Sequence, residues 1–273
     1  MIPDIATLAP LVGLLLLSGA FAGLLAGMLG VGGGIVHVPA FFFVFSTLGY
    51  ESPKLMQVCL ATSLAAIVIT SLRSVAAHNK RGAVDWGILK TWAPGIVIGA
   101  IVGVFVAAQV RTEALEALFG IVAMLVGLYL AFGRPDWRLG QQMPGLAGRS
   151  VLSPLVGLLS VLMGIGGGTF GVPLMTLFGV AIHNAVATAA GFGALIAVPS
   201  VIGFLLVDVA DAPPLTFGAV NLPAFVVAVS MTLVTAPIGA KIAHKLDGMT
   251  LRRSFAVFIL IVAVNMLFTA FGS

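Results

Sequence analysis

Charge is scarce in this sequence. Only 8% of its 273 residues are Asp, Glu, Lys or Arg, whereas 60% are hydrophobic. Typical soluble domains carry about 25% charged residues, because a folded chain needs polar surface to cover its core. The composition therefore excludes a soluble protein and indicates an integral membrane protein that lies in the lipid bilayer.

Catalytic signatures are also lacking. The single cysteine, Cys59, cannot form an internal disulfide and is read as a small apolar residue. The sequence contains no GxSxG, HExxH, acidic pair or cysteine–histidine signature, so it predicts no catalytic residue, metal or cofactor. The net charge of +4 does not indicate nucleic-acid binding, because the basic residues lie between apolar stretches.

The apolar segments predict an all-α polytopic membrane protein, since the alternating pattern of a membrane β-barrel is absent. Crossing about 30 Å of hydrocarbon takes about 20 helical residues. Three segments are shorter and interrupted by glycine, which is typical of re-entrant or broken helices. The predicted helices cover residues 10–29, 35–48, 57–77, 88–109, 114–133, 151–163, 169–181, 184–207, 218–243 and 250–271.

Two motifs of the first half return in the second. GVGGG at 30–34, followed by Val-Pro, corresponds to GIGGG at 164–168, again followed by Val-Pro. GAVD at 82–85 corresponds to GAVN at 218–221. The shared order indicates a duplication. We predict repeat 1 over 10–133, a cytoplasmic linker over 134–150 and repeat 2 over 151–271, each repeat being a glycine-rich hairpin (10–48 and 151–181) followed by three helices.

The positions of the basic residues predict which connections lie on which side of the membrane. Four, three and four of the 13 basic residues lie in the connections around 73–90, in the central linker and at 241–253. Basic connections stay in the cytoplasm, so the acidic connection around 208–211 falls outside. Each glycine-containing pair must then begin and end on one face, as a hairpin. Three crossings follow each hairpin, so the repeats are inverted and both termini lie outside.

The two hairpin tips are expected to approach the membrane midplane from opposite faces. Each leads into a half-helix, near Ile35 and Thr169, whose N-terminus offers unpaired N–H groups and a partial positive charge. Glycine permits unusual backbone conformations and close approaches. Two such ends would form an anion site from backbone alone. The alternative is that the glycines only let helices pack closely.

Polar side chains inside apolar segments complete the candidate site. His37 either binds the anion, relays a proton or is packed against a carbonyl. Thr169 either caps its half-helix or donates to the ligand, and Arg73 either reaches the cytoplasmic surface or clamps the anion. For the remaining polar residues the alternative is interhelical hydrogen bonding. The predicted substrate-binding residues are Gly32, Gly33, Gly34, His37, Gln57, Thr62, Ser63, Arg73, Gly166, Gly167, Gly168, Thr169, His183, Asn184 and Thr188.

Acidic residues are missing from the interior of the predicted spans. All nine Asp and Glu residues lie in connections or at the ends of predicted helices. Cation transporters and proton relays commonly use a carboxylate at depth, whereas an anion pathway does not. This distribution argues against cation antiport.

The paired motifs GVGGGIVHVP and GIGGGTFGVP, in a chain of this size with two repeats, resemble the sulfite exporter TauE/SafE family. The resemblance covers residues from about 10 to 271. It implies a bacterial inner-membrane permease for small sulfur-containing anions, namely sulfite or organosulfonates such as sulfoacetate. Members have about eight membrane segments, which is compatible with six crossings and two broken hairpins.

We therefore expect a secondary transporter that moves a small oxyanion by alternating access, with the lipid bilayer and the anion as its partners and no nucleic acid. The alternatives are an intramembrane enzyme or a permease for an unrelated small anion. The sequence leaves open the anion, the direction of transport, a coupled H⁺ or Na⁺, and a homo-oligomer.

Overall fold

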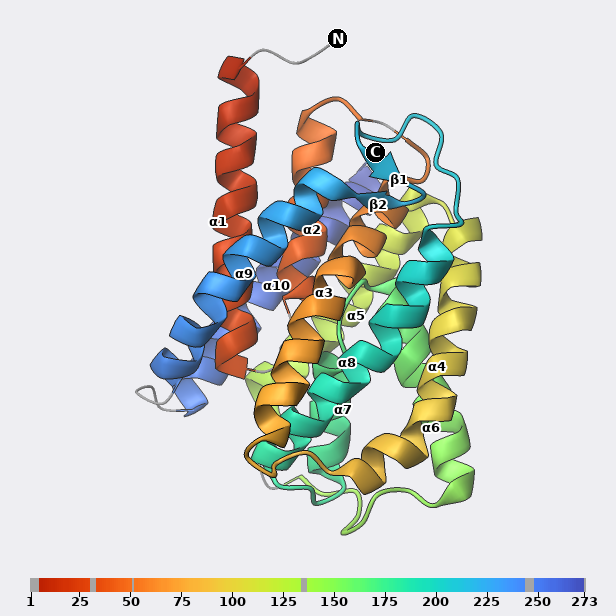
Figure 1. Ribbon diagram of the computed structural model, residues 1–273, viewed down its shortest axis with the longest axis vertical. Helices are drawn as coiled ribbons and strands as arrows, with labels where there is room; N and C mark the ends of the chain where they lie inside the picture. The colour runs from red at the N-terminus through yellow and green to blue at the C-terminus, as the bar shows by residue number, and fades with distance from the viewer. Residues whose placement is uncertain (1–4, 30–32, 51, 134–136, 244–247, 273) are drawn as a thin grey trace.

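Ten helices form one bundle over the residues that the computed structural model describes, which are 5–29, 33–50, 52–133, 137–243 and 248–272 (Figure 1). This confirms the all-α polytopic membrane fold. The helices are α1 (Ile5–Leu29), α2 (Gly34–Thr47), α3 (Leu55–Asn79), α4 (Trp86–Gln109), α5 (Thr112–Phe132), α6 (Leu146–Leu162), α7 (Gly168–Leu177), α8 (Ile182–Phe204), α9 (Leu222–Ala243) and α10 (Gly248–Gly272).

Five of these helices are long and apolar enough to cross a membrane, namely α3, α4, α5, α8 and α9. α10 has 25 residues, and at 1.5 Å per residue it extends about 37 Å. By the same rise, the 14 residues of α2 and the 10 of α7 extend only about 21 and 15 Å. The glycine motifs therefore precede the two half-length helices, as the pattern predicts.

Several boundaries differ from the expectation, and α1 begins at Ile5, five residues before the expected segment. α6 begins at Leu146 and has 17 residues, so it starts five residues before the expected segment. α9 begins at Leu222 instead of residue 218, because Gly218 has a φ of +56° and lies in a turn between two short strands. These strands, β1 (Thr216–Phe217) and β2 (Val220–Asn221), pair antiparallel and were not expected from the sequence.

The two hairpins open at opposite ends of the bundle. In Figure 1, α1 descends from the upper end and α2 returns to it, while α6 ascends from the lower end and α7 returns there. α1 begins and α10 ends at the upper end. The long helices α3, α4 and α5 follow the first hairpin, and α8, α9 and α10 follow the second.

Helices from the two halves of the chain pack in pairs, α1 with α9, α4 with α6, α5 with α10 and α3 with α8. Glycines permit the closest of these contacts. A Cβ at Gly99 of α4 would overlap the carbonyl of Pro154 in α6, and one at Gly239 of α9 would overlap the carbonyl of Leu24 in α1. Such small-residue interfaces are typical of membrane helices, whose association depends on close packing.

The periphery of the bundle is apolar. Phe105 of α4 is 65% exposed, and Leu125 of α5 and Ile261 of α10 are likewise exposed. α3 and α8 are the most buried of the spans and form the centre. In water, such a surface would cause aggregation; in a bilayer, it is the surface that lipid covers. Polar side chains in this buried centre are therefore the candidates for a functional site.

Candidate functional site

The tips of the two hairpins meet inside the bundle. A Cβ placed on Gly34, the first residue of α2, would lie 2.5 Å from the carbonyl oxygen of Gly164 and 2.9 Å from the Cα of Ile165. Ser63 of α3 donates a hydrogen bond of 2.7 Å to the same Gly164 carbonyl. A side chain at Gly34 would force the two tips apart, so glycine here is what lets them touch.

The glycines of the tips have two different roles. Gly164 has a φ of +61°, in the left-handed region that favours glycine. Gly33 and Gly167 have ordinary helical angles, with φ of −74° and −62°. Space explains Gly167, because a Cβ there would lie 2.8 Å from both the carbonyl oxygen of Ala189 and the amide nitrogen of Gly193. Gly32 lies outside the described residues.

Two helix N-termini are buried at this contact. α2 begins at Gly34 after the N-cap Gly33, and α7 begins at Gly168 after the N-cap Gly167. All four residues, and Gly166 before them, are buried. Neither cap residue has a side chain that could accept from the first N–H groups. The first turn of a helix has no intrahelical acceptors for its N–H groups, so each tip offers donors to a buried ligand.

Three side chains near the tips have unpaired polar atoms. His37 is 1% exposed and stacks on Phe41, with ring centroids 5.5 Å apart. Both ring nitrogens, Oγ1 of Thr169 and Oγ of Ser160 lack a hydrogen-bond partner among the described residues. Buried polar groups in folded proteins are normally paired. Unpaired ones close to the start of α2 and of α7 therefore make these side chains candidates for binding a ligand.

Two alternatives weighed for these residues are wrong. His37 is packed but not hydrogen-bonded to a carbonyl, since neither of its nitrogens has a partner within the described chain. Thr169 is not the N-cap, because α7 begins one residue earlier and Gly167 occupies that position. Ser160, 0% exposed on α6, was not selected from the sequence. A single serine inside an apolar helix carries no signal until the fold places it one turn before the tip.

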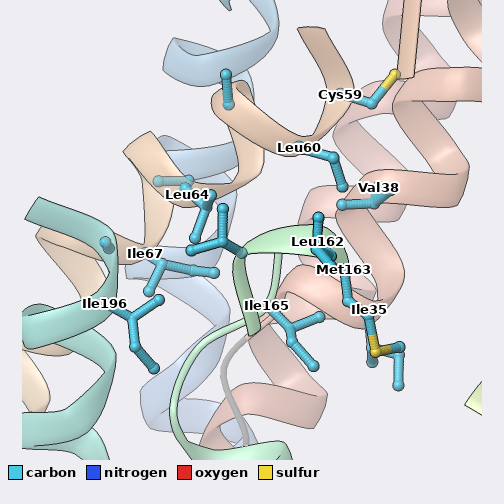
Figure 2. Close-up of a cluster of buried hydrophobic side chains, with 14 of the residues drawn as sticks. Ile35, Val38, Cys59, Leu60, Leu64, Ile67, Leu162, Met163, Ile165 and Ile196 are labelled. Atoms are coloured by element: carbon cyan, nitrogen blue, oxygen red, sulfur yellow. The ribbon is translucent and has the colours of Figure 1, made fainter. Parts of the chain in front are cut away.

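The surroundings of the tips are apolar. Figure 2 shows the cluster in which α2, α3, α8 and the second tip come together; its labelled members are Ile35, Val38, Cys59, Leu60, Leu64, Ile67, Leu162, Met163, Ile165 and Ile196. Except for Leu162, at 5%, none exceeds 1% exposure. In such a low-dielectric setting, hydrogen bonds and helix dipoles act more strongly than in water.

Thr62 and Thr188 each accept a hydrogen bond from a residue in the other half of the chain. The hydroxyl of Thr62 in α3 accepts from the amide of Asn221, and that of Thr188 in α8 accepts from the amide of Asp85, both at 2.9 Å. Asp85 in turn accepts from Ile88 N at the start of α4, and Asn221 accepts from Ala224 N at the start of α9. Both threonines therefore hold capping residues in place.

The other residues predicted to bind the substrate either form hydrogen bonds within the bundle or lie at its surface. Gln57 donates to the carbonyls of Ala107 (2.9 Å) and Val110 (2.6 Å). Interhelical hydrogen bonding, the alternative for these polar residues, therefore describes Gln57, Thr62, Ser63 and Thr188. His183, Asn184 and Arg73 are exposed, at the first turn of α8 and near the last turns of α3. The structure does not bring these three to the tips.

Glu116 is an acidic residue that is buried near the start of a helix. It lies in the second turn of α5, a membrane-crossing helix, and is only 3% exposed. Its neighbour Glu113 is instead exposed and forms an ion pair with Arg111 at 3.4 Å. Glu116 therefore lies near a helix end, as expected, but its carboxyl group is buried inside the bundle. The sequence showed its position near a helix end but not that α5 turns it inward.

Comparison with known proteins identifies the family. The model of the family described as "Sulfite exporter TauE/SafE" matches residues 15–266. The chain belongs to the sulfite exporter TauE/SafE family. A "Probable membrane transporter protein" of Haemophilus influenzae is 32% identical over 257 residues, covering 93% of this chain and 97% of the relative. A relative with the same description from Methanocaldococcus jannaschii is 25% identical, covering 88% and 89%.

A third TauE/SafE relative, the probable membrane transporter protein YunE of Bacillus subtilis, is 29% identical over 186 residues, covering 60% of this chain and 67% of the relative. No solved structure matches the chain. Family and relatives agree with the apolar helices that this protein is a multi-pass membrane transporter.

Proposed function

We propose that this TauE/SafE protein is a secondary transporter of small sulfur-containing oxyanions, such as sulfite or sulfoacetate, and that it exports them from the cell. The observation that carries the proposal is that the buried N-terminus of α2, at Gly34, lies against the second tip at Gly164 and Ile165, from which the buried N-terminus of α7 follows at Gly168. The family supports the sulfur chemistry, and the site supports the charge of the substrate.

An oxyanion suits these donors. Its oxygens would accept from the first N–H groups of α7 and α2, from the hydroxyl of Thr169 and from an N–H of His37; the two side chains have no other hydrogen-bond partner among the described residues. A helix N-terminus favours a negative charge by up to about 2 kcal/mol when partly buried. Two of them together supply up to about 4 kcal/mol, which corresponds to at most a factor of about 10³ in affinity. That is strong enough to select an anion and weak enough to release it.

Access to the site requires movement. Residues 160–169, from the end of α6 through the second tip to the start of α7, are buried, as are residues 33–38 at the first tip. Alternating access would part the helices around the tips first on one face and then on the other. The opposite opening directions of the two hairpins support two inverted repeats, over 10–133 and 151–271 (Figure 1).

The bacterial inner membrane, with both termini outside, is the proposed location. Its basis is the positive-inside rule applied to the basic connections, which puts the linker that follows α5 in the cytoplasm. Coupling to H⁺ or Na⁺ is part of the proposal as a secondary transporter. His37 and Glu116 are titratable side chains buried in the described part of the bundle and are available for a proton.

Flux through purified protein in liposomes tests the proposal. We expect sulfite or sulfoacetate to cross at a saturable rate, and the Gly167→Val variant to lose this flux while remaining folded. Gly145→Val is the matched control, because a Cβ at exposed Gly145 meets nothing within 4 Å. Flux of phosphate or chloride instead would favour the unrelated-anion permease, and no flux of any anion would refute the transporter site. Full activity of Gly167→Val would show that the position of the second tip does not matter for transport.

A further inference from the structure

An apolar groove runs along the outside of the bundle between α4 and α8. It encloses about 430 Å³. Its lining residues are Val75 of α3, Trp86, Leu89 and Val97 of α4, and Gly191, Ala194, Leu195, Val198, Pro199 and Ile202 of α8. The one polar group among these side chains, the indole N–H of Trp86, is donated to Oδ1 of Asn79 at 2.9 Å. The groove therefore offers its occupant only van der Waals contacts.

The groove is open to the bilayer and has the length of one acyl chain. Trp86 is 45% exposed, and Val198 and Ile202 on the opposite wall are also exposed. The wall formed by α4 reaches from Trp86 to Val97, which is about 16 Å at the helical rise. One leaflet contributes half of the hydrocarbon core of about 30 Å. A single extended acyl chain thus matches the groove.

Positive charge gathers at the end of the groove where Trp86 lies. Lys80 and Arg81 are exposed in the turn between α3 and α4, and Lys90 is exposed one helical turn after Trp86. Asp85 is the one acidic residue between residues 80 and 90, and its carboxylate already accepts from Ile88 N. Tryptophan prefers the membrane interface, so this end lies at the depth of lipid headgroups.

We propose that the groove binds a phospholipid with an anionic headgroup, one acyl chain lying between α4 and α8 and the phosphate against Arg81 and Lys90. The positive charge at the Trp86 end of the groove favours a lipid with a negatively charged headgroup. A zwitterionic lipid gains less from the three cations, since each Lys or Arg near an anionic membrane surface adds about 1 kcal/mol. A second copy of this chain would bring its own Arg81 and Lys90 to the same contact, and these charges would repel.

Quenching of Trp86 fluorescence by lipid tests this proposal independently of transport. The protein, with Trp92→Phe and Trp137→Phe so that Trp86 alone emits, is reconstituted in phosphatidylcholine vesicles. Phosphatidylglycerol brominated in mid-chain is added in one series and brominated phosphatidylcholine in the other. We expect half-maximal quenching at an about fivefold lower mole fraction of the anionic lipid, which corresponds to one cation's contribution. Native mass spectrometry of the wild-type chain makes the same comparison with Trp92 in place.

Two charge variants locate the preference. Arg81→Gln with Lys90→Gln should make the two brominated lipids equal. Lys241→Gln with Arg253→Gln, which removes two exposed charges from α9 and α10, should leave the preference intact. Equal quenching by both lipids in the parent protein would overturn the proposal. A preference for the anionic lipid that survives in Arg81→Gln with Lys90→Gln would also overturn it. So would a preference that disappears equally in the two double variants, because diffuse surface charge would explain that loss.

Discussion

The tip glycines Gly33 and Gly167 occupy corresponding positions in the two motifs, yet their replacement by alanine should have unequal effects. Both have helical backbone angles, so alanine adopts either position without backbone strain. A Cβ at Gly167 would overlap Cβ of Phe192 and lie 2.8 Å from two backbone atoms of α8. A Cβ at Gly33 meets the ring end of His37 at 2.9 Å and Cβ of Ala22 at 3.1 Å.

The cost in stability of each alanine depends on whether the atoms around it can move away. At Gly167 the backbone of α8 must withdraw by more than about 0.6 Å to restore ordinary contact at 3.4 Å. Overpacking of this kind costs about 1–3 kcal/mol, whereas Gly→Ala returns about 0.4–1 kcal/mol by restricting the unfolded chain. Gly167→Ala should therefore destabilise the protein by about 1.3 kcal/mol, the difference between the mid-range values of the two effects. At Gly33 the imidazole of His37 can rotate away, so the two effects nearly cancel.

Thermal unfolding in detergent and sulfite flux in liposomes measure the difference. We expect Gly167→Ala to lower the melting temperature and to slow flux, because the displaced tip no longer aims its donors at the site. Gly33→Ala should keep the melting temperature and alter flux only through His37. Gly145→Ala, at an exposed position, serves as the control. Equal destabilisation at the two tips, or a Gly167→Ala protein as stable as wild type, would refute the steric argument.

Three further outcomes are expected. Cysteines replacing Arg81 and Lys241 should react with an impermeant thiol reagent from one face of the membrane and a cysteine at Ala210 from the other; reaction of the first two from opposite faces would disprove the inverted repeats. His37→Ala should weaken sulfite binding, with His37→Gln, which keeps a hydrogen-bond donor, retaining more affinity, whereas identical affinities for all three proteins would remove His37 from the site. Thr188→Val leaves the partly buried backbone N–H of Asp85 unpaired and should cost about 1 kcal/mol of stability with unchanged sulfite affinity, and a loss of affinity without a loss of stability would contradict its capping role.

Segment composition predicted the helices well, because a bilayer demands long apolar stretches and glycine interrupts them visibly. The segment at 35–48 became α2 at Gly34–Thr47, and the one at 88–109 became α4 at Trp86–Gln109. The ribbon at 216–221 was missed. Its strands have two residues each, and the helical pattern of the following segment conceals them.

Predicting individual site residues was harder, because hydrogen-bond partners distant in sequence decide the role of a polar side chain. Thr62 and Ser63 are adjacent in the sequence, yet one accepts from Asn221 and the other donates to Gly164. Neither bond can be inferred from spacing. His37 and Thr169 remain candidates for the opposite reason, since the fold buries them and leaves their polar atoms unpaired among the described residues.

The pairing of helices across the two halves has a mechanical consequence. Since α1 lies on α9, α4 on α6, α5 on α10 and α3 on α8, the helices of residues 5–133 make their largest contacts with helices of residues 137–272. A rigid tilt of one half against the other would open four helix contacts at once, including those where Gly99 and Gly239 admit a neighbouring carbonyl. A movement that exposes the tips must therefore slide or bend helices inside mixed groups drawn from both halves, and any hinge lies within the pairs instead of in the connection between α5 and α6.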